Sequence, residues 1–137
     1  MQILTEGDKG YVYNGRFTGP VQLEMIIEAA AEPLADVPNL GAVDVARIHH
    51  EDGAVTHWHT HPGGQILTLV SGVGRVGSDE GATTGILPGT VIRTDPGERH
   101  WHGADEGSDC VWHSVVWGVT DWSDDNPLAG LAGLEGR

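Results

Sequence analysis

The sequence predicts an all-β protein, either a sandwich or a barrel of short strands. The chain of 137 residues has 21 glycines and 7 prolines, which is too turn-rich for a helix bundle, and its 39% of hydrophobic residues is too apolar for a disordered chain. From Gly41 onward, short β-favouring runs recur with turn residues between them. The length suits one core. We therefore expect a single domain over residues 1–137, with its core at about 40–120 and a tail at 121–137.

The strands are expected in the following order. A short aromatic strand is expected around Tyr11 to Tyr13. The segment 21–34 is expected to run from a strand into a loop, with a helical turn ended by Pro33 as the alternative for its alanine-rich second half. The later strands are expected in six runs, at 42–50, 54–61, 65–77, 83–89, 90–95 and 110–120. The tail has no strand pattern, which predicts a loose terminus, a lid or an interface arm.

The charge balance excludes two classes of partner. A formal net charge of -13, from 20 acidic and 7 basic residues, repels phosphate backbones and anionic lipid headgroups. We expect a small-molecule substrate, no nucleic acid and no membrane. Cys110 is the only cysteine, which excludes an intrachain disulfide. The first residues lack a basic region followed by a long apolar run, so a cytoplasmic location is expected.

Six of the eight histidines fall into three short clusters near the ends of expected strands. The clusters are His57, His59 and His61; His100 and His102; and His113. A spacing of two residues on a strand places side chains on one face, where neutral imidazoles can share a transition-metal ion. One isolated histidine would more often be a surface residue or a core residue bonded to a backbone carbonyl. The clustering favours a metal site.

These residues match a known sequence motif. In residues 53–72, five positions have the spacing of the first cupin motif, with glutamine where glutamate is usual. The five are Gly53, His59, His61, Gln65 and Gly72. The stretch 89–104 resembles the second cupin motif through Gly89, Gly97 and His100, although Asp95 replaces the usual proline and Ala104 the usual asparagine.

The resemblance to the cupins covers roughly residues 40–120, with only 16 residues between Gly72 and Gly89. It implies a jelly-roll β-barrel. It also implies one divalent transition metal inside the barrel, held by His59, His61, Gln65 and His100. Small barrels of this family commonly pair through their outer sheets, so the resemblance implies a homodimer as well.

Two phrases, at residues 57–65 and 96–104, are similar to those of the small manganese-dependent cupin hydroxynitrile lyases. Those proteins cleave cyanohydrins reversibly to an aldehyde and hydrogen cyanide. The resemblance implies manganese first among the metals, with iron, zinc, nickel and copper also able to bind such ligands.

A glutamine ligand has a direct chemical consequence. Four neutral protein ligands leave the metal its full positive charge, which favours Lewis-acid chemistry on a coordinated hydroxyl. An unligated histidine can then move a proton. The candidates are His113 and His102, with His113 preferred because its strand is expected to point it into the barrel. For His102, a rim position that hydrogen-bonds a neighbour is an equal alternative.

Trp117 shares the alternation of His113 and is expected to form an apolar pocket wall with Ala46, Ile48 and Leu67. The alternative is that these side chains only fill the core of a small barrel. Other aromatic and histidine side chains are expected away from the metal. Trp58, Trp101 and Trp112 are expected to face outward, His57 to lie at the rim, and His49 and His50 to lie on the surface.

Three functions compete on this basis. The first is a metal-dependent lyase of the hydroxynitrile-lyase type. The second is a metal-dependent dioxygenase or other oxidative-cleavage enzyme, for which a histidine-rich site with iron, or with copper or manganese in its place, is also suited. The third is a non-catalytic module that binds a ligand or a metal. All three share the metal site, so the sequence separates them weakly.

Overall fold

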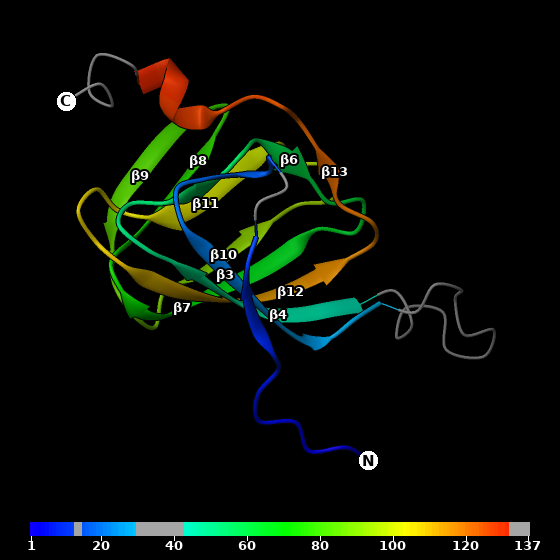
Figure 1. Ribbon diagram of the computed structural model, residues 1–137. Coiled ribbons are helices and arrows are strands. Elements are labelled where there is room, and N and C mark those ends of the chain that lie inside the picture. The colour runs from blue at the N-terminus through cyan, green and yellow to red at the C-terminus, as the bar shows by residue number, and fades with distance from the viewer. Residues whose placement is uncertain (13–14, 30–42, 132–137) are drawn as a thin grey trace.

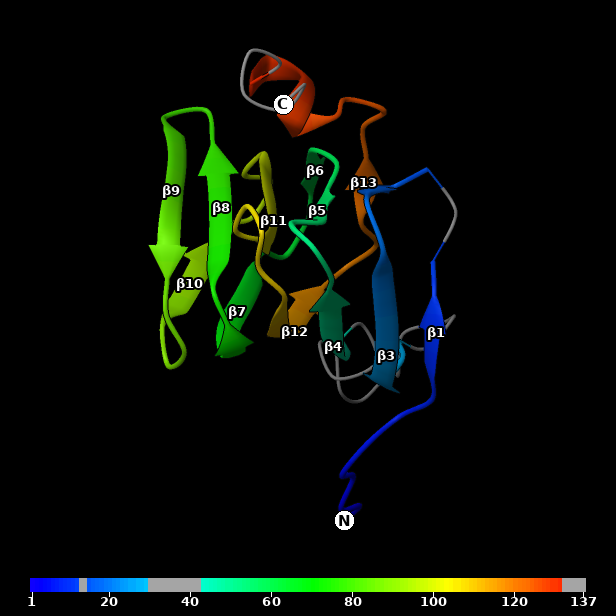
Figure 2. The ribbon, with the colours of Figure 1, turned by 60° about the vertical axis from the view of Figure 1, so that its left-hand side comes forward.

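The computed structural model describes residues 1–12, 15–29 and 43–131, and in them two antiparallel sheets face each other across a common core (Figures 1 and 2). The all-β class that the sequence predicts is confirmed. The first sheet has six strands in the order β1-β3-β4-β12-β7-β10. Their bounds are Lys9–Tyr11 (β1), Val21–Ile27 (β3), Val43–His50 (β4), Cys110–Trp117 (β12), Gln65–Gly72 (β7) and Val91–Thr94 (β10).

The second sheet has seven strands, and β11 lies at its centre. Strand β11 pairs with β5, β6 and β8, while β13, β2 and β9 extend the sheet outward. Their bounds are Phe17–Thr18 (β2), Val55–Thr56 (β5), His59–Thr60 (β6), Gly74–Ser78 (β8), Gly81–Ile86 (β9), His100–Ala104 (β11) and Asp121–Trp122 (β13).

Alternation along β12 shows which side chains form the core. Cys110, Trp112, Ser114 and Val116 are buried, while the residues between them are partly exposed. Trp112 is fully buried, and its indole N–H donates to the carbonyl of Gly103 at 3.0 Å, which ties β12 to the opposite sheet. Buried apolar side chains from both sheets complete this cluster. A buried indole with its N–H satisfied is a stable way to join two sheets.

The structure corrects several expected strand boundaries. The run at 54–61 is divided into β5 and β6, because the chain leaves the sheet at His57 and Trp58. The run at 65–77 is divided at Val73. Strands β2, β11 and β13 were not predicted as strands. Tyr13 and Pro33 lie outside the described residues.

Gly72 shows why the first motif ends on glycine. Its φ of 78° lies in the left-handed region, and a Cβ there would overlap the carbonyl oxygen of Asp109. Only glycine lets β7 turn into β8 so close to the start of β12.

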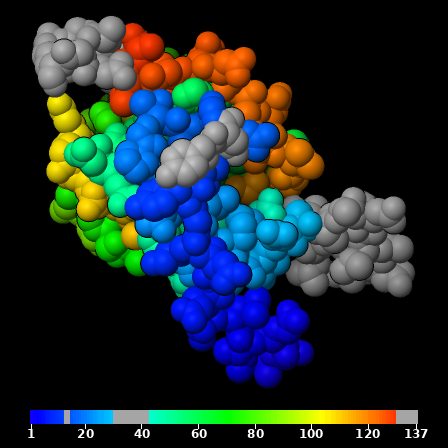
Figure 3. Space-filling view, in the orientation of Figure 1, coloured from blue at the N-terminus to red at the C-terminus, as the bar shows by residue number. Residues whose placement is uncertain are grey.

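The tail is partly ordered against the barrel. A 3-10 helix at Pro127–Leu131 lies at one end of the barrel (Figures 1 and 2), and the buried Leu128 packs with Val55 and Trp101 against Trp58. The first residues of the chain extend away from the barrel instead (Figures 1 and 3). Among the described residues, no helix has the length and apolar character needed to cross a membrane.

Candidate metal centre

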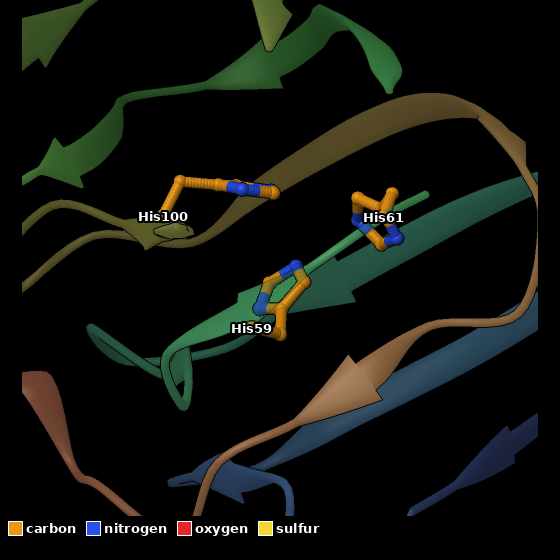
Figure 4. Close-up of side chains that lie close together, drawn as sticks. All are labelled: His59, His61 and His100. Carbon is orange, nitrogen blue, oxygen red and sulfur yellow. The ribbon is translucent and has the colours of Figure 1, made fainter. Parts of the chain in front are cut away.

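Three histidines, two on strands of the second sheet and one just after β6, come together inside the barrel (Figure 4). His59 begins β6, His61 follows its end, and His100 begins β11, where it is the direct cross-strand partner of His59. One ring nitrogen from each of the three lies within 4.8 Å of the others. All three side chains are almost fully buried. The pairing of β6 with β11 therefore builds a candidate metal site.

Gln65 completes the group from the opposite sheet. Its side-chain amide donates to Ser114 Oγ at 2.8 Å, and its carbonyl oxygen Oε1 lies 2.9 Å from Nε2 of His100. Both Gln65 and Ser114 are buried. The bond to Ser114 thus directs the amide N–H away from the histidines and the carbonyl oxygen toward them.

The other nitrogens of the three rings are held by oxygen acceptors or hydroxyls. His59 Nδ1 donates to the carbonyl of His57 at 2.8 Å, and His100 Nδ1 donates to the carbonyl of Glu98 at 2.9 Å. A carbonyl can only accept, so both rings carry their proton on Nδ1 and present an unprotonated Nε2. His61 Nδ1 lies 3.0 Å from the hydroxyl of Thr120. The two carbonyl contacts fix the tautomer of His59 and His100, and the contact with Thr120 helps to orient the ring of His61.

Burial keeps all three imidazoles neutral. It lowers the pKa of His59 to about 2 and that of His61 to about 3, and the neighbouring His100 adds a repulsive contribution to both. Burial also lowers the pKa of His100. Neutral imidazole is the form that binds a metal, so these residues do not need to lose a proton before binding at neutral pH.

Three atoms of the group are unexplained without a cation. Nε2 of His61 is buried and has no hydrogen-bond partner among the described residues. Nε2 of His100 and Oε1 of Gln65 face each other at 2.9 Å although both present lone pairs. Buried acceptors without a donor are costly, and one divalent cation between them would satisfy all of them. The donor set fits a transition metal such as manganese, iron or zinc.

Three of the four residues, His59, His61 and Gln65, line a cavity of about 370 Å³, whereas His100 does not. The polar end of the cavity includes His59, His61, Gln65 and His102. The remaining wall is largely apolar: Phe17, Leu23, Met25, Ala46, Ile48 and Val116. The cavity has the size and the mixture of apolar wall and few polar groups that small-molecule sites show.

Among the cavity residues that were missed from the sequence, three form a group next to His59. Trp122 on β13 pairs with β6 and lies against the ring of His59, with centroids 4.5 Å apart. The ring centroids of Phe17, on β2, and Trp122 are 5.5 Å apart. The guanidinium carbon of Arg16 lies 5.5 Å from the centre of the Trp122 ring. Strands β2 and β13 have only two residues each, which is too short for a periodic pattern to reveal.

The structure corrects the expected direction of His113 and Trp117. Both lie on the partly exposed face of β12, and neither lines the cavity; Ser114 and Val116 line it instead. Alternation makes residues 113, 115 and 117 share a face, as expected, but this face is the outer one. Trp117 lines a separate surface hollow with Asp95 and Pro96.

The other predicted pocket residues divide between cavity and core. Ala46 and Ile48 line the cavity, as does His102. Leu67 does not: it is fully buried in the core cluster and borders a smaller cavity of about 150 Å³ on the other side of the barrel, next to His100.

Some residues expected outside lie inside. Trp112 and His50 are fully buried, against the expectation of an outward tryptophan and a surface histidine. His49, by contrast, lies on the outer face, where its Nε2 is 2.9 Å from Oε1 of the buried Glu24. His57 is partly buried and does not line the cavity. Trp101 faces outward as expected and is covered there by Leu128.

Comparison with known sequences identifies the family. The sequence profile of the Cupin domain matches residues 46–116, which include every residue of the candidate metal site. The chain belongs to the cupin family. The two facing sheets are accordingly a cupin jelly-roll barrel, as the motif spacing predicted.

Among its relatives, this cupin is 42% identical over 88 residues to (R)-mandelonitrile lyase of Granulicella tundricola, which covers 64% of this chain and 61% of the lyase. The match thus spans less than two thirds of the lyase. A solved cupin-like protein of Thermotoga maritima is 29% identical with a TM-score of 0.74, and each chain covers 100% of the other. Acetylacetone dioxygenase of Acinetobacter johnsonii has a TM-score of 0.69 at 14% identity, covering 92% of this chain and 80% of that one.

Proposed function

We propose that this cupin is a metal-dependent lyase that cleaves cyanohydrins reversibly to an aldehyde and hydrogen cyanide. One observation carries the proposal: three members of the metal-competent group, His59, His61 and Gln65, line a largely apolar cavity that is also lined by a histidine outside the group, His102. The similarity to (R)-mandelonitrile lyase supports the choice of substrate class. Manganese is the metal that we propose first.

His59, His61, Gln65 and His100 would hold the metal. When bound, a divalent metal with four neutral ligands supplies a Lewis acid for the hydroxyl oxygen of the substrate. His102 takes the hydroxyl proton. The bond between the carbinol carbon and the nitrile carbon then breaks, its electron pair leaves on cyanide, and cyanide takes the proton from His102 to form hydrogen cyanide, which returns His102 to its neutral form. The apolar wall around Ile48 and Phe17 holds the substituent of the carbinol carbon and excludes water.

The test is the release of benzaldehyde from mandelonitrile by protein loaded with Mn(II), with the bound metal measured in the same sample. We expect turnover that is lost in His59→Ala. The matched control is His113→Ala, which removes an imidazole from the outer face of β12 and should retain wild-type turnover. Absence of turnover in a sample that demonstrably contains Mn(II) would refute the proposal.

An oxygenase is the second candidate, because the same three histidines would also suit iron. Consumption of oxygen by the Fe(II)-loaded protein with phenolic, thiol or alkene substrates, together with no cyanohydrin cleavage, would favour that candidate over the lyase.

A further inference from the structure

The cavity beside the candidate metal site has a cationic side chain at its mouth. Among the described residues that line the cavity, Arg16 is the only lysine or arginine and Asp44 is the only carboxylate. Arg16 is exposed, whereas His59, His61 and Gln65 at the polar end are buried. A guanidinium that borders a largely apolar cavity, in a protein with a net charge of -13, calls for an explanation.

The backbone holds Arg16 close to the candidate metal site. Arg16 directly precedes β2, which pairs with β5, and its carbonyl oxygen accepts the backbone N–H of His57 at 2.8 Å. The guanidinium carbon lies 5.5 Å from the centre of the Trp122 ring, which lies 4.5 Å from the centre of the His59 ring. Because these two distances add to about 10 Å, the guanidinium lies no farther than that from the ring of His59. A small aromatic substrate with its reacting group beside His59 can therefore reach Arg16 with a substituent at its other end.

A carboxylate is the group that such a side chain recognises best. A guanidinium has five N–H donors in a planar fork that matches the two oxygens of a carboxylate, and hydrogen bonds between such charged partners are stronger than neutral ones. Arg16 can therefore bind a carboxylate in addition to the contacts that it already makes. The ring of Trp122 attracts the guanidinium and helps to hold it at the cavity. Because the net charge of the protein repels anions, an anionic substrate depends on a local cation of this kind.

Asp44 lies at a different part of the cavity wall. Its Oδ1 accepts the backbone N–H of Ala29 at 2.6 Å. Asp44 comes four residues before Ile48 on β4, which corresponds to about 13 Å along a strand. Phe17, the neighbour of Arg16, packs against the apolar cluster that contains Ile48. The carboxylate of Asp44 is thus separated from the part of the mouth at which Arg16 lies.

We propose that Arg16 is a specificity-determining residue that binds a carboxylate at the far end of the substrate. The cavity then prefers aromatic cyanohydrins that carry a carboxylate on the ring position opposite the carbinol carbon. The carbinol group lies beside His59, His61 and Gln65, and the aromatic ring lies beside Trp122, between the two ends of the cavity. This inference rests on the proposed function, because it names the substrate class of the same cavity.

The first test measures binding rather than turnover, by isothermal titration calorimetry of the full chain loaded with Mn(II). The two ligands are 4-(hydroxymethyl)benzoate and its uncharged counterpart, 4-(hydroxymethyl)benzamide. The wild type should bind the carboxylate about three- to tenfold more tightly than the carboxamide, as expected for a solvent-exposed ion pair. This preference should shrink when NaCl is raised from about 20 mM to about 500 mM.

Arg16→Met removes the charge and keeps an apolar stem, and it leaves the backbone bond to His57 in place. This variant should bind the two ligands within about 1.5-fold of each other. Arg93→Met is the matched control, because Arg93 is an exposed arginine on β10 that does not line this cavity, and it should keep the preference of the wild type. A wild type without the preference would overturn the inference. A preference that persists in Arg16→Met would do so as well, because another group, such as the bound metal, would then hold the carboxylate.

The second test is kinetic and compares two cyanohydrins. The ratio of kcat/KM for 4-carboxymandelonitrile to that for 4-carbamoylmandelonitrile should fall about three- to tenfold in Arg16→Met and stay unchanged in Arg93→Met. An equal ratio in the wild type and Arg16→Met would overturn the inference while leaving the proposed function intact. If the wild type cleaves neither compound, the proposed function fails, and the calorimetry alone decides the role of Arg16.

Discussion

Replacing Ser114 by alanine should weaken metal binding although Ser114 is not itself a candidate ligand. Its hydroxyl accepts the side-chain amide of Gln65 at 2.8 Å, and both residues are buried. Ser114→Ala leaves that amide N–H without a partner, which costs about 1–3 kcal/mol when the group is buried. The carboxamide can relieve the cost by rotating, and the rotation takes the carbonyl oxygen away from His100.

The expected size of the effect follows from this geometry. Loss of a group that orients a ligand typically costs about ten- to a hundredfold in metal affinity, which corresponds to about 1.4–2.7 kcal/mol. Titration with Mn(II), followed by electron paramagnetic resonance of the free ion, measures the affinity. Ser71→Ala, on the exposed end of β7, is the matched control and should bind like the wild type. If Ser114→Ala bound Mn(II) within about twofold of the wild type, the oriented carbonyl of Gln65 would not be a ligand.

Four further results are expected. Leu128→Ala should lower the free energy of unfolding, measured by urea denaturation, by about 2 kcal/mol. The control is Leu87→Ala, at an exposed position, which should lower it by less than about 0.5 kcal/mol. Equal effects would show that the tail is not packed on the barrel. In the folded protein without metal, burial lowers the pKa of His50 to about 3, while the unfolded chain keeps the ordinary value of 6.5, so the unfolded chain binds more protons below pH 6.5. The free energy of unfolding should therefore fall as the pH falls from 6.5 toward 3, with His50 contributing up to about 1.4 kcal/mol per pH unit. Urea denaturation between about pH 5 and pH 7 should show that the free energy of unfolding depends less steeply on pH in His50→Phe than in the wild type. An unchanged pH dependence would contradict the lowered pKa of His50. Trp122→Ala should raise KM for mandelonitrile about two- to tenfold, because the cavity loses an aromatic wall; an unchanged KM would place the substrate elsewhere. Burial raises the pKa of the Cys110 thiol to about 12, so a thiol reagent should label it only after unfolding, and rapid labelling of the native protein would contradict its burial.

The corrections on β12 show where sequence reasoning reached its limit. Alternation placed His113 and Trp117 on one face, but it did not decide between that face and the one with Trp112, Ser114 and Val116. Both sets contain a tryptophan and a valine, so hydrophobicity does not separate them. The choice is made by packing, because Ser114 reaches Gln65 and the indole of Trp112 reaches Gly103.

The residues that were missed share a different cause. Phe17 and Trp122 come from two-residue strands whose place depends on pairing with β5 and β6, and His50 is buried because Val21 and Cys110 flank it on the neighbouring strands. Each of these contacts joins segments that are far apart in the chain. No local pattern records such contacts.

The sequence by itself predicted the all-β class, because glycine turns and short β-favouring runs leave a local pattern, and its two cupin-like motifs named His59, His61, Gln65 and His100 as one group. Only the tertiary structure decided which histidine outside that group faces the cavity, which aromatic side chains wall it, and that the tail packs on the barrel. Those outcomes depend on how the two sheets pack over one core, because a side chain faces inward only where it fits the side chains of the opposite sheet.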